Sequence, residues 1–170
     1  MHVYHGDGKG KTTAAMGLAL RALGAGARVA IVQFLKAGTS GEVVMLDDMP
    51  CAFVLADPAC AKFAWEMTDA ERERVRALHD QLLSEALRLI DEDYADMLVL
   101  DEVLDALSSG LVDAALVERA LAVGARDAEV VLTGHALTPE IREAADYLTE
   151  MRCEKHPFNQ GVPARKGIEY

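Results

Sequence analysis

A glycine-rich segment with two lysines, Gly6-Asp7-Gly8-Lys9-Gly10-Lys11-Thr12-Thr13, is the first feature of this chain that could do chemistry. Glycines allow backbone N–H groups to converge on phosphate oxygens without clashes from Cβ atoms. The run 1–5 before it predicts a strand. The Ala- and Leu-rich run 12–24 after it predicts a helix, whose N-terminus adds partial positive charge. This context predicts a loop that binds the phosphates of a nucleoside triphosphate.

Two side chains of this loop have expected roles. Lys11 should reach the terminal phosphates, and the Thr12 hydroxyl should hold Mg²⁺. The standard pattern has its first glycine where this chain has His5, so the loop is one residue shorter than usual. The shorter loop still fits phosphates but argues against the usual nucleotide pose. The alternative interpretation is a glycine-rich turn with two surface lysines.

Two carboxylates, Asp101 and Glu102, follow the apolar run 97–100, which predicts a buried strand. In phosphate-loop proteins this position places a carboxylate beside the loop, where it holds Mg²⁺ directly or through water. Neighbouring residues on an extended strand point to opposite faces, so only one reaches the metal unless the chain turns there. The alternative is an acidic cap on the following helix, but the loop upstream favours the metal role.

Strands and helices alternate along the chain. Apolar runs predict further strands over 28–34, 52–55, 129–133 and 147–151. Periodicity and capping signals predict helices over 68–90 and 112–123 and a helix that begins at 138. Segment 36–42 is expected to be a loop and the tail from 155 to be irregular. The alternation predicts a single α/β domain over 1–170, a P-loop NTPase-like (RecA-like) parallel sheet with helices on both faces.

The composition narrows the possible partners. The chain has 170 residues and a formal net charge of −11. An acidic chain has no general attraction for nucleic acid or an anionic membrane, so neither is expected as a partner. No signal peptide or run of about 20 apolar residues is present, which predicts a soluble, cytoplasmic protein. The three cysteines, Cys51, Cys60 and Cys153, fit no metal-ligand spacing and are expected to be reduced.

Over nearly its full length the chain resembles the phosphate-loop type of cob(I)alamin or cob(I)yrinic acid a,c-diamide adenosyltransferases, the corrinoid adenosyltransferases. The resemblance rests on the loop, on the short spacing within it and on motifs distributed along the chain. These motifs are Arg21-Ala22-Leu23-Gly24, Val32-Gln33-Phe34-Leu35-Lys36, Gly41-Glu42, Phe63-Ala64-Trp65-Glu66, Leu100-Asp101-Glu102, Thr133-Gly134, Ala145-Asp146, Thr149-Glu150-Met151, Lys155-His156-Pro157-Phe158, Gly161 and Gly167-Ile168-Glu169-Tyr170.

The resemblance implies that Co(I) of a reduced corrinoid attacks C5′ of ATP, that the adenosyl group moves to cobalt, and that triphosphate leaves. It implies that ATP binds along Gly6–Thr13 in the opposite sense to ordinary phosphate-loop NTPases. Lys9 and Lys11 would then stabilise the departing triphosphate. Thr12 and Glu102 match the family's Mg²⁺ ligands, with Asp101 in support. An electron-donating reductase or flavoprotein and a homodimer are also implied.

The resemblance assigns Phe63 and Trp65 to the corrinoid site, near the lower face of the corrin ring. Removal of the lower axial ligand and of water there leaves four-coordinate Co(II), which is easier to reduce to Co(I). From the residues alone, the alternative is that both are core side chains, because Phe and Trp two positions apart on a strand share one face.

Three departures from the family pattern stand out. His135 follows Thr133-Gly134 where arginine is usual, and arginine gives a permanent forked phosphate contact that histidine does not. His135 is expected either to reach a phosphate or to be an ordinary loop histidine. Leu104-Asp105 stands where an aromatic residue is common. The sequence also begins at the first strand, so a lid over the corrinoid is expected to be missing or supplied otherwise.

Two rival functions explain part of the pattern. An ATP-hydrolysing NTPase would account for the loop and the acidic pair, but not for Phe63-Ala64-Trp65 or the C-terminal motifs. A non-catalytic carrier of ATP and adenosylated corrinoid would account for all of them. The choice between complete cobalamin and an earlier corrin intermediate stays open.

Overall fold

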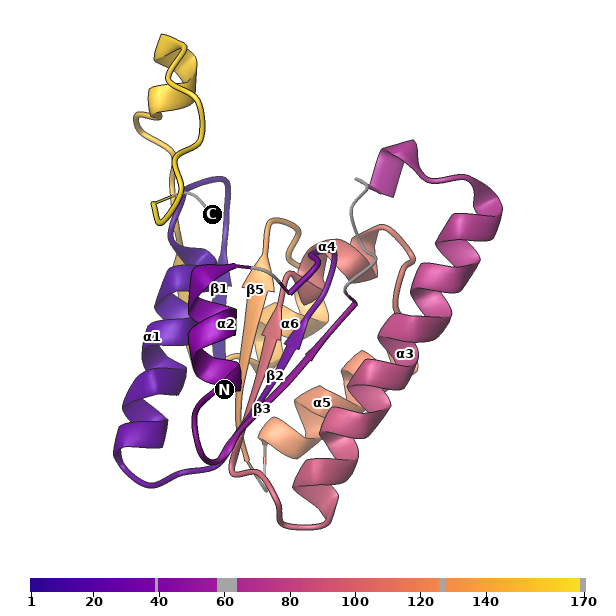
Figure 1. The fold of residues 1–170 in the computed structure, drawn as a ribbon. Coiled ribbons are helices and arrows are strands. Elements are labelled where there is room, and N and C mark those ends of the chain that lie inside the picture. The colour runs from indigo at the N-terminus through magenta and orange to yellow at the C-terminus, as the bar shows by residue number, and fades with distance from the viewer. Residues whose placement is uncertain (39, 58–63, 126–127, 169–170) are drawn as a thin grey trace.

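The fold is built around one six-stranded sheet, whose strand order is β3-β2-β4-β5-β1-β6 (Figure 1). The computed structural model describes residues 1–38, 40–57, 64–125 and 128–168. Every pair of neighbouring strands in the sheet is parallel, as predicted. The strands are β1 (His2–His5), β2 (Val29–Gln33), β3 (Ala52–Ala56), β4 (Met97–Asp101), β5 (Glu129–Gly134) and β6 (Tyr147–Glu150).

Helices cover both faces of the sheet, which confirms the predicted fold class. Helices α1 and α2 lie on one face, and α3 and α5 lie on the other (Figure 1). The helices are α1 (Lys11–Gly24), α2 (Gly41–Asp47), α3 (Asp69–Asp91), α4 (Val103–Ser108), α5 (Ala114–Gly124) and α6 (Pro139–Ala144), with short 3-10 turns η1 (Ala64–Glu66) and η2 (Pro157–Gln160). Among the described residues, no helix is both long and apolar enough to cross a bilayer.

The central strands are apolar because both of their faces are covered. Every residue of β2 and β4 is buried, as expected of strands in the middle of a parallel sheet. One core cluster joins α1 and α2 to the sheet, and a second joins α3, α4, α5 and α6 to the opposite face. The long helix α3 begins with the predicted capping box between Thr68 and Glu71.

Two short helices depart from the sequence-based expectation. Residues 36–42 were expected to be a loop, but α2 begins at Gly41 and includes Glu42. Helix α4 begins directly after Glu102. These helices span seven and six residues, too few for a 3.6-residue period to stand out.

The strand order brings separate segments to one edge of the sheet. Strand β5 lies between β1 and β4, and β2 pairs with the other side of β4. Because all these strands are parallel, the residues that follow β1, β5, β4 and β2 meet at the carboxyl edge, where open α/β sheets bind their ligands. These are the glycine-rich loop, His135, Glu102 and Lys36.

Candidate active site at the carboxyl edge of the sheet

The glycine-rich loop connects β1 to α1. Gly10 precedes the helix with φ of 115°, a conformation that suits glycine. Glycine has no side chain with which to cap the helix, so no side-chain cap competes with a ligand for the first-turn amides of α1. The side chains of Lys9 and Thr13 are exposed. The arrangement is that of an anion-binding helix N-terminus.

The first half of the loop packs tightly against the chain that follows β6. A Cβ atom on Gly6 or Gly8 would lie 2.5 or 2.7 Å from the Met151 carbonyl oxygen. The Gly8 N–H donates to that oxygen at 2.7 Å, and the Cys153 N–H donates to Asp7 Oδ1 at 3.1 Å. Gly6 and Gly8 therefore serve close backbone packing, and in this conformation the Gly8 N–H already has a partner other than a phosphate.

Lys11 is folded across its own loop. Its Nζ donates to the carbonyl oxygens of Gly6 at 2.7 Å and Gly8 at 2.9 Å. Only 7% of the residue is exposed. The ammonium group thus lies against the backbone of the loop, and Lys11 is the residue that contacts phosphates in the phosphate-loop pattern.

Asp101 is fully buried and accepts four hydrogen bonds. Its Oδ1 accepts from the hydroxyls of Thr12 and Thr133, both at 2.8 Å. Its Oδ2 accepts from Gln33 Nε2 at 3.0 Å and from Lys36 Nζ at 2.9 Å. A buried carboxylate is tolerated only when it is paired and hydrogen-bonded. Asp101 therefore links the phosphate loop to β2 and β5 and orients the Thr12 hydroxyl.

Lys36 lies between the two carboxylates. Its Nζ is 2.9 Å from Asp101 Oδ2 and 3.3 Å from Glu102 Oε1. Burial alone would lower the pKa of Lys36, but the charges of Asp101 and Glu102 hold it above its usual value. Burial raises the pKa of Glu102, and the negative charge of Asp101 adds to this, against the opposing effect of Lys36. The site therefore concentrates negative charge around one cation.

The chain turns at Glu102, so both members of the acidic pair reach the site. Glu102 has φ of 64°, and its N–H donates to Thr133 Oγ1 at 2.8 Å. A non-glycine residue held in this region is strained and recurs at functional sites. On a continuous strand, Asp101 and Glu102 would point to opposite faces, but the turn brings both side chains to the carboxyl edge.

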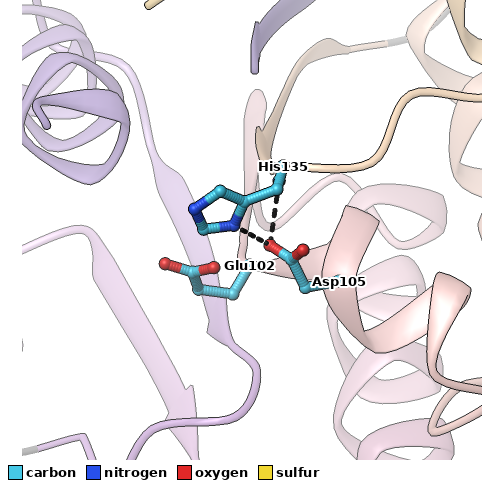
Figure 2. Close-up of side chains that lie close together, drawn as sticks. All are labelled: Glu102, Asp105 and His135. Carbon is cyan, nitrogen blue, oxygen red and sulfur yellow. Dashed lines mark hydrogen bonds and ion pairs between the residues drawn. The ribbon is translucent and has the colours of Figure 1, made fainter. Parts of the chain in front are cut away.

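Glu102 also belongs to a cluster with Asp105 and His135, shown in Figure 2. One ligand atom from each residue lies within 4.8 Å of the other two. The N–H and the Nδ1 of His135 contact the same Asp105 Oδ2, at 2.9 and 3.0 Å. His135 and Asp105, both singled out by the sequence analysis, are therefore in direct contact. Carboxylate and imidazole groups in this arrangement could hold a metal ion.

The aromatic pair is only partly described. Phe63 lies outside the described residues. Trp65 lies on η1 and is 78% exposed, so the alternative of a core tryptophan on a strand is wrong. Arg72 holds this segment, because its Nη1 donates to the Ala64 carbonyl at 3.0 Å and its Nη2 donates to the Ser109 carbonyl.

Sequence reasoning assigned no role to Gln33, Lys36 or Thr133, and it did not connect Asp105 with His135. The first three lie in motifs that carry the family resemblance, so their presence was noted but their contacts were not. The missing information was strand register. Gln33 pairs with Asp101 in the β2–β4 ladder, and Thr133 follows the residue that pairs with Leu100.

The fold and this site together define a phosphate-loop protein of the α/β class. A parallel sheet carries a glycine-rich loop that enters a helix, and the loop threonine is hydrogen-bonded to a carboxylate at the end of a strand two positions away in the sheet.

The chain belongs to the ATP:corrinoid adenosyltransferase BtuR/CobO/CobP family, whose model matches residues 1–170. It is 37% identical to a corrinoid adenosyltransferase from Pseudomonas aeruginosa, over 99% of this chain and 82% of the relative. It is 35% identical to the enzyme of the same name from Escherichia coli strain K12 and 34% identical to "Corrinoid adenosyltransferase CobA" from Salmonella typhimurium. Each of these two matches covers 99% of this chain and 84% of the relative.

Proposed function

We propose that this family member transfers the 5′-deoxyadenosyl group of ATP to Co(I) of a corrinoid, either cobalamin or cobyrinic acid a,c-diamide, and releases inorganic triphosphate. The cobalt electron pair forms the bond to C5′ as the bond from C5′ to the triphosphate oxygen breaks. The observation that carries the proposal is the Thr12–Asp101 hydrogen bond, which fixes the phosphate loop against a buried carboxylate in a chain of this family.

The residues of the loop are suited to a triphosphate leaving group. Positive charge is available in and beside the loop from the first-turn amides of α1, the buried Lys11 and the exposed Lys9. Positive groups that are already in place stabilise charge that develops during a reaction without a cost of reorganisation. ATP would lie along Gly6–Thr13, with the phosphates toward α1.

The oxygens near the loop fit Mg²⁺. Thr12 offers a hydroxyl and Glu102 a carboxylate, and Mg²⁺ prefers such hard oxygen ligands. Asp101 already accepts four hydrogen bonds, so its proposed role is to orient Thr12. Bound Mg²⁺ would neutralise charge on the triphosphate. His135 is proposed to contact a phosphate from the end of β5.

The corrinoid is proposed to bind at the aromatic segment. The exposed Trp65 ring on η1 offers an apolar surface, and Arg72 keeps η1 attached to α3. Phe63 is proposed to share this role. Because the reaction needs cobalt as Co(I), an electron-donating reductase or flavoprotein is the proposed partner, and the proposed form is a cytoplasmic homodimer.

The test is an anaerobic reaction of the protein with Mg-ATP and cob(I)alamin, or with the a,c-diamide, followed by absorbance and by identification of the phosphate product. We expect light-sensitive adenosylated corrinoid and triphosphate over many turnovers. Lys11→Ala should abolish the reaction, whereas Lys166→Ala, in the exposed tail, should not change it. ADP and phosphate as the main products would indicate an NTPase, and binding of both substrates without turnover would indicate a carrier.

A further inference from the structure

The two oxygens proposed to bind a metal ion and one oxygen of Asp101 all contact one ammonium group. Lys36 Nζ lies 3.0 Å from Thr12 Oγ1, 2.9 Å from Asp101 Oδ2 and 3.3 Å from Glu102 Oε1. The Lys36 side chain is 34% exposed, whereas the Asp101 side chain is fully buried. A single ammonium group thus contacts both oxygens that are proposed as Mg²⁺ ligands.

The Thr12 hydroxyl shows why the two cations compete. Its hydrogen is donated to Asp101 Oδ1 at 2.8 Å, so only its lone pairs can face the cation position. In this structure the hydroxyl oxygen accepts the Lys36 N–H. The hydroxyl oxygen has two lone pairs, so a metal ion bound through the other one would lie next to the Lys36 ammonium group.

The distances place the two cations close together. Mg²⁺ binds its oxygens at about 2.0–2.1 Å. An ion at that distance from Thr12 Oγ1 would lie no more than about 5 Å from Lys36 Nζ, which is 3.0 Å from the same oxygen. The two positive charges would repel one another, so departure of Lys36 favours entry of the metal ion.

We propose that Lys36 is the resident cation of the nucleotide-free site, that it excludes a metal ion arriving alone, and that Mg²⁺ replaces it only together with the phosphates of ATP. The inference rests on the proposed Thr12–Glu102 metal site. Without ATP, the displaced ammonium would leave two carboxylates for solvent. With ATP, phosphates bound beside Thr12 would offer the Lys36 ammonium group a new anionic partner. Lys36 thereby couples metal binding to nucleotide binding.

The test measures Mn²⁺ binding by the electron paramagnetic resonance of the free ion, with no corrinoid present. We expect the wild-type protein to bind Mn²⁺ at least tenfold more tightly with ATP than without it. Lys36→Met should bind Mn²⁺ without nucleotide at least tenfold more tightly than wild type. Lys36→Arg, which keeps the charge, should stay within about threefold of wild type. Arg119→Met removes the same charge beside Asp91 of α3, away from the carboxyl edge, and should also stay within about threefold.

Glu102→Gln separates failure of the metal site from failure of this inference. If Mn²⁺ binding with ATP is the same in wild type and Glu102→Gln, the proposed metal site is wrong, and the inference fails with it. If binding depends on Glu102 but nucleotide-free Lys36→Met binds no more tightly than wild type, only the role of Lys36 is wrong.

A measurement on the unaltered protein covers the case in which Lys36→Met does not fold. The Nζ resonance of Lys36 in ¹⁵N-labelled protein, assigned by its loss in Lys36→Arg, should shift when Mg²⁺ and ATP are added together. It should stay in place when the same concentration of Mg²⁺ is added alone. An unchanged resonance with Mg²⁺ and ATP, or an equal shift with Mg²⁺ alone, would overturn the proposal.

Discussion

At the scale of single residues, Asp101 acts through the groups that it holds. Each of its oxygens accepts two hydrogen bonds, and hydrogen bonds to a charged acceptor are about twice as strong as neutral ones. The hydroxyl of Thr12 is thereby held by Asp101. The Thr133 hydroxyl accepts a hydrogen bond from the Glu102 N–H and donates one to Asp101. Thr133 is therefore the link between the two carboxylates.

Replacement of Thr133 by valine should remove the hydrogen bonds that link Asp101 to the backbone of Glu102. Thr133→Val keeps the shape but leaves the Glu102 N–H without an acceptor and Asp101 with one donor fewer. We expect a loss of about 1–3 kcal/mol in the free energy of unfolding and weaker Mn²⁺ binding in the presence of ATP. Thr149→Val, on the exposed strand β6, should change stability by less than about 0.5 kcal/mol. Equal stability of the two variants in urea denaturation would contradict this account.

At the scale of elements, the phosphate loop depends on the segment that follows β6. The Met151 N–H donates to His5 and its carbonyl accepts from Gly8, both at 2.7 Å. The parallel β1–β6 ladder ends at His5 and Glu150, so this contact continues the sheet into the loop. The segment Thr149-Glu150-Met151, on which the sequence resemblance partly rests, thus has a structural role, because the backbone of Met151 is hydrogen-bonded to His5 and to Gly8 of the loop.

Gly8→Ala should therefore disturb the packing of the loop against the 151–152 segment. A Cβ atom at Gly8 would lie 2.7 Å from the Met151 carbonyl and 2.8 Å from the Arg152 carbonyl carbon. Because these are backbone atoms, the loop and the 151–152 segment must move apart. We expect a loss of about 1–3 kcal/mol in the free energy of unfolding and at least tenfold weaker ATP binding by calorimetry.

Gly17→Ala is the matched control. A Cβ there meets nothing within 4 Å, and alanine should stabilise α1 by about 0.5–1 kcal/mol. ATP binding by Gly8→Ala at wild-type strength would refute the dependence.

At the scale of the whole molecule, local patterns predicted the strands, the helices and the phosphate loop, because each of these depends on neighbours in sequence. The alternation of strands and helices then predicted a parallel sheet. The capping box of α3 and the buried strands β2 and β4 are examples. The contact of Lys36 with Asp101 spans 65 residues and exists only because β2 lies beside β4. Neither the order of strands nor their register is encoded in a local period. The acidic pair was predicted as a unit, but the turn at Glu102 that lets both members reach the site was not.

The same long-range packing places a buried histidine behind the site. His79 of α3 is fully buried. Its Nδ1 lies 2.8 Å from the Leu111 carbonyl, and its Nε2 accepts the Leu35 N–H at 3.4 Å. These contacts assign the hydrogen to Nδ1 and require neutral imidazole. Burial lowers the pKa of His79, and this effect exceeds the opposing effects of the Leu111 carbonyl, Asp57 and Asp80. His79 thus holds α3 against the residue that precedes Lys36.

This lowered pKa predicts a loss of stability in mild acid. As pH falls below about 6.5, the unfolded chain binds a proton at His79 that the folded protein does not bind until its own lower pKa is reached. Between these two values, the free energy of unfolding should fall by up to about 1.4 kcal/mol per pH unit. Above pH 6.5 the contribution of His79 is constant. Urea denaturation between pH 5 and 8 measures it.

His79→Gln is the variant that isolates the titration. Its side-chain amide can donate to Leu111 and accept from Leu35 without binding a proton, so the pH dependence of stability should be shallower than in wild type. His156→Gln, in the C-terminal tail, makes the same replacement away from α3 and is the matched control. His2, whose pKa is also lowered by burial, contributes equally to all three proteins and cancels in the comparison. The same slope in His79→Gln and wild type would show that the folded protein accommodates a charged imidazole between α3 and β2.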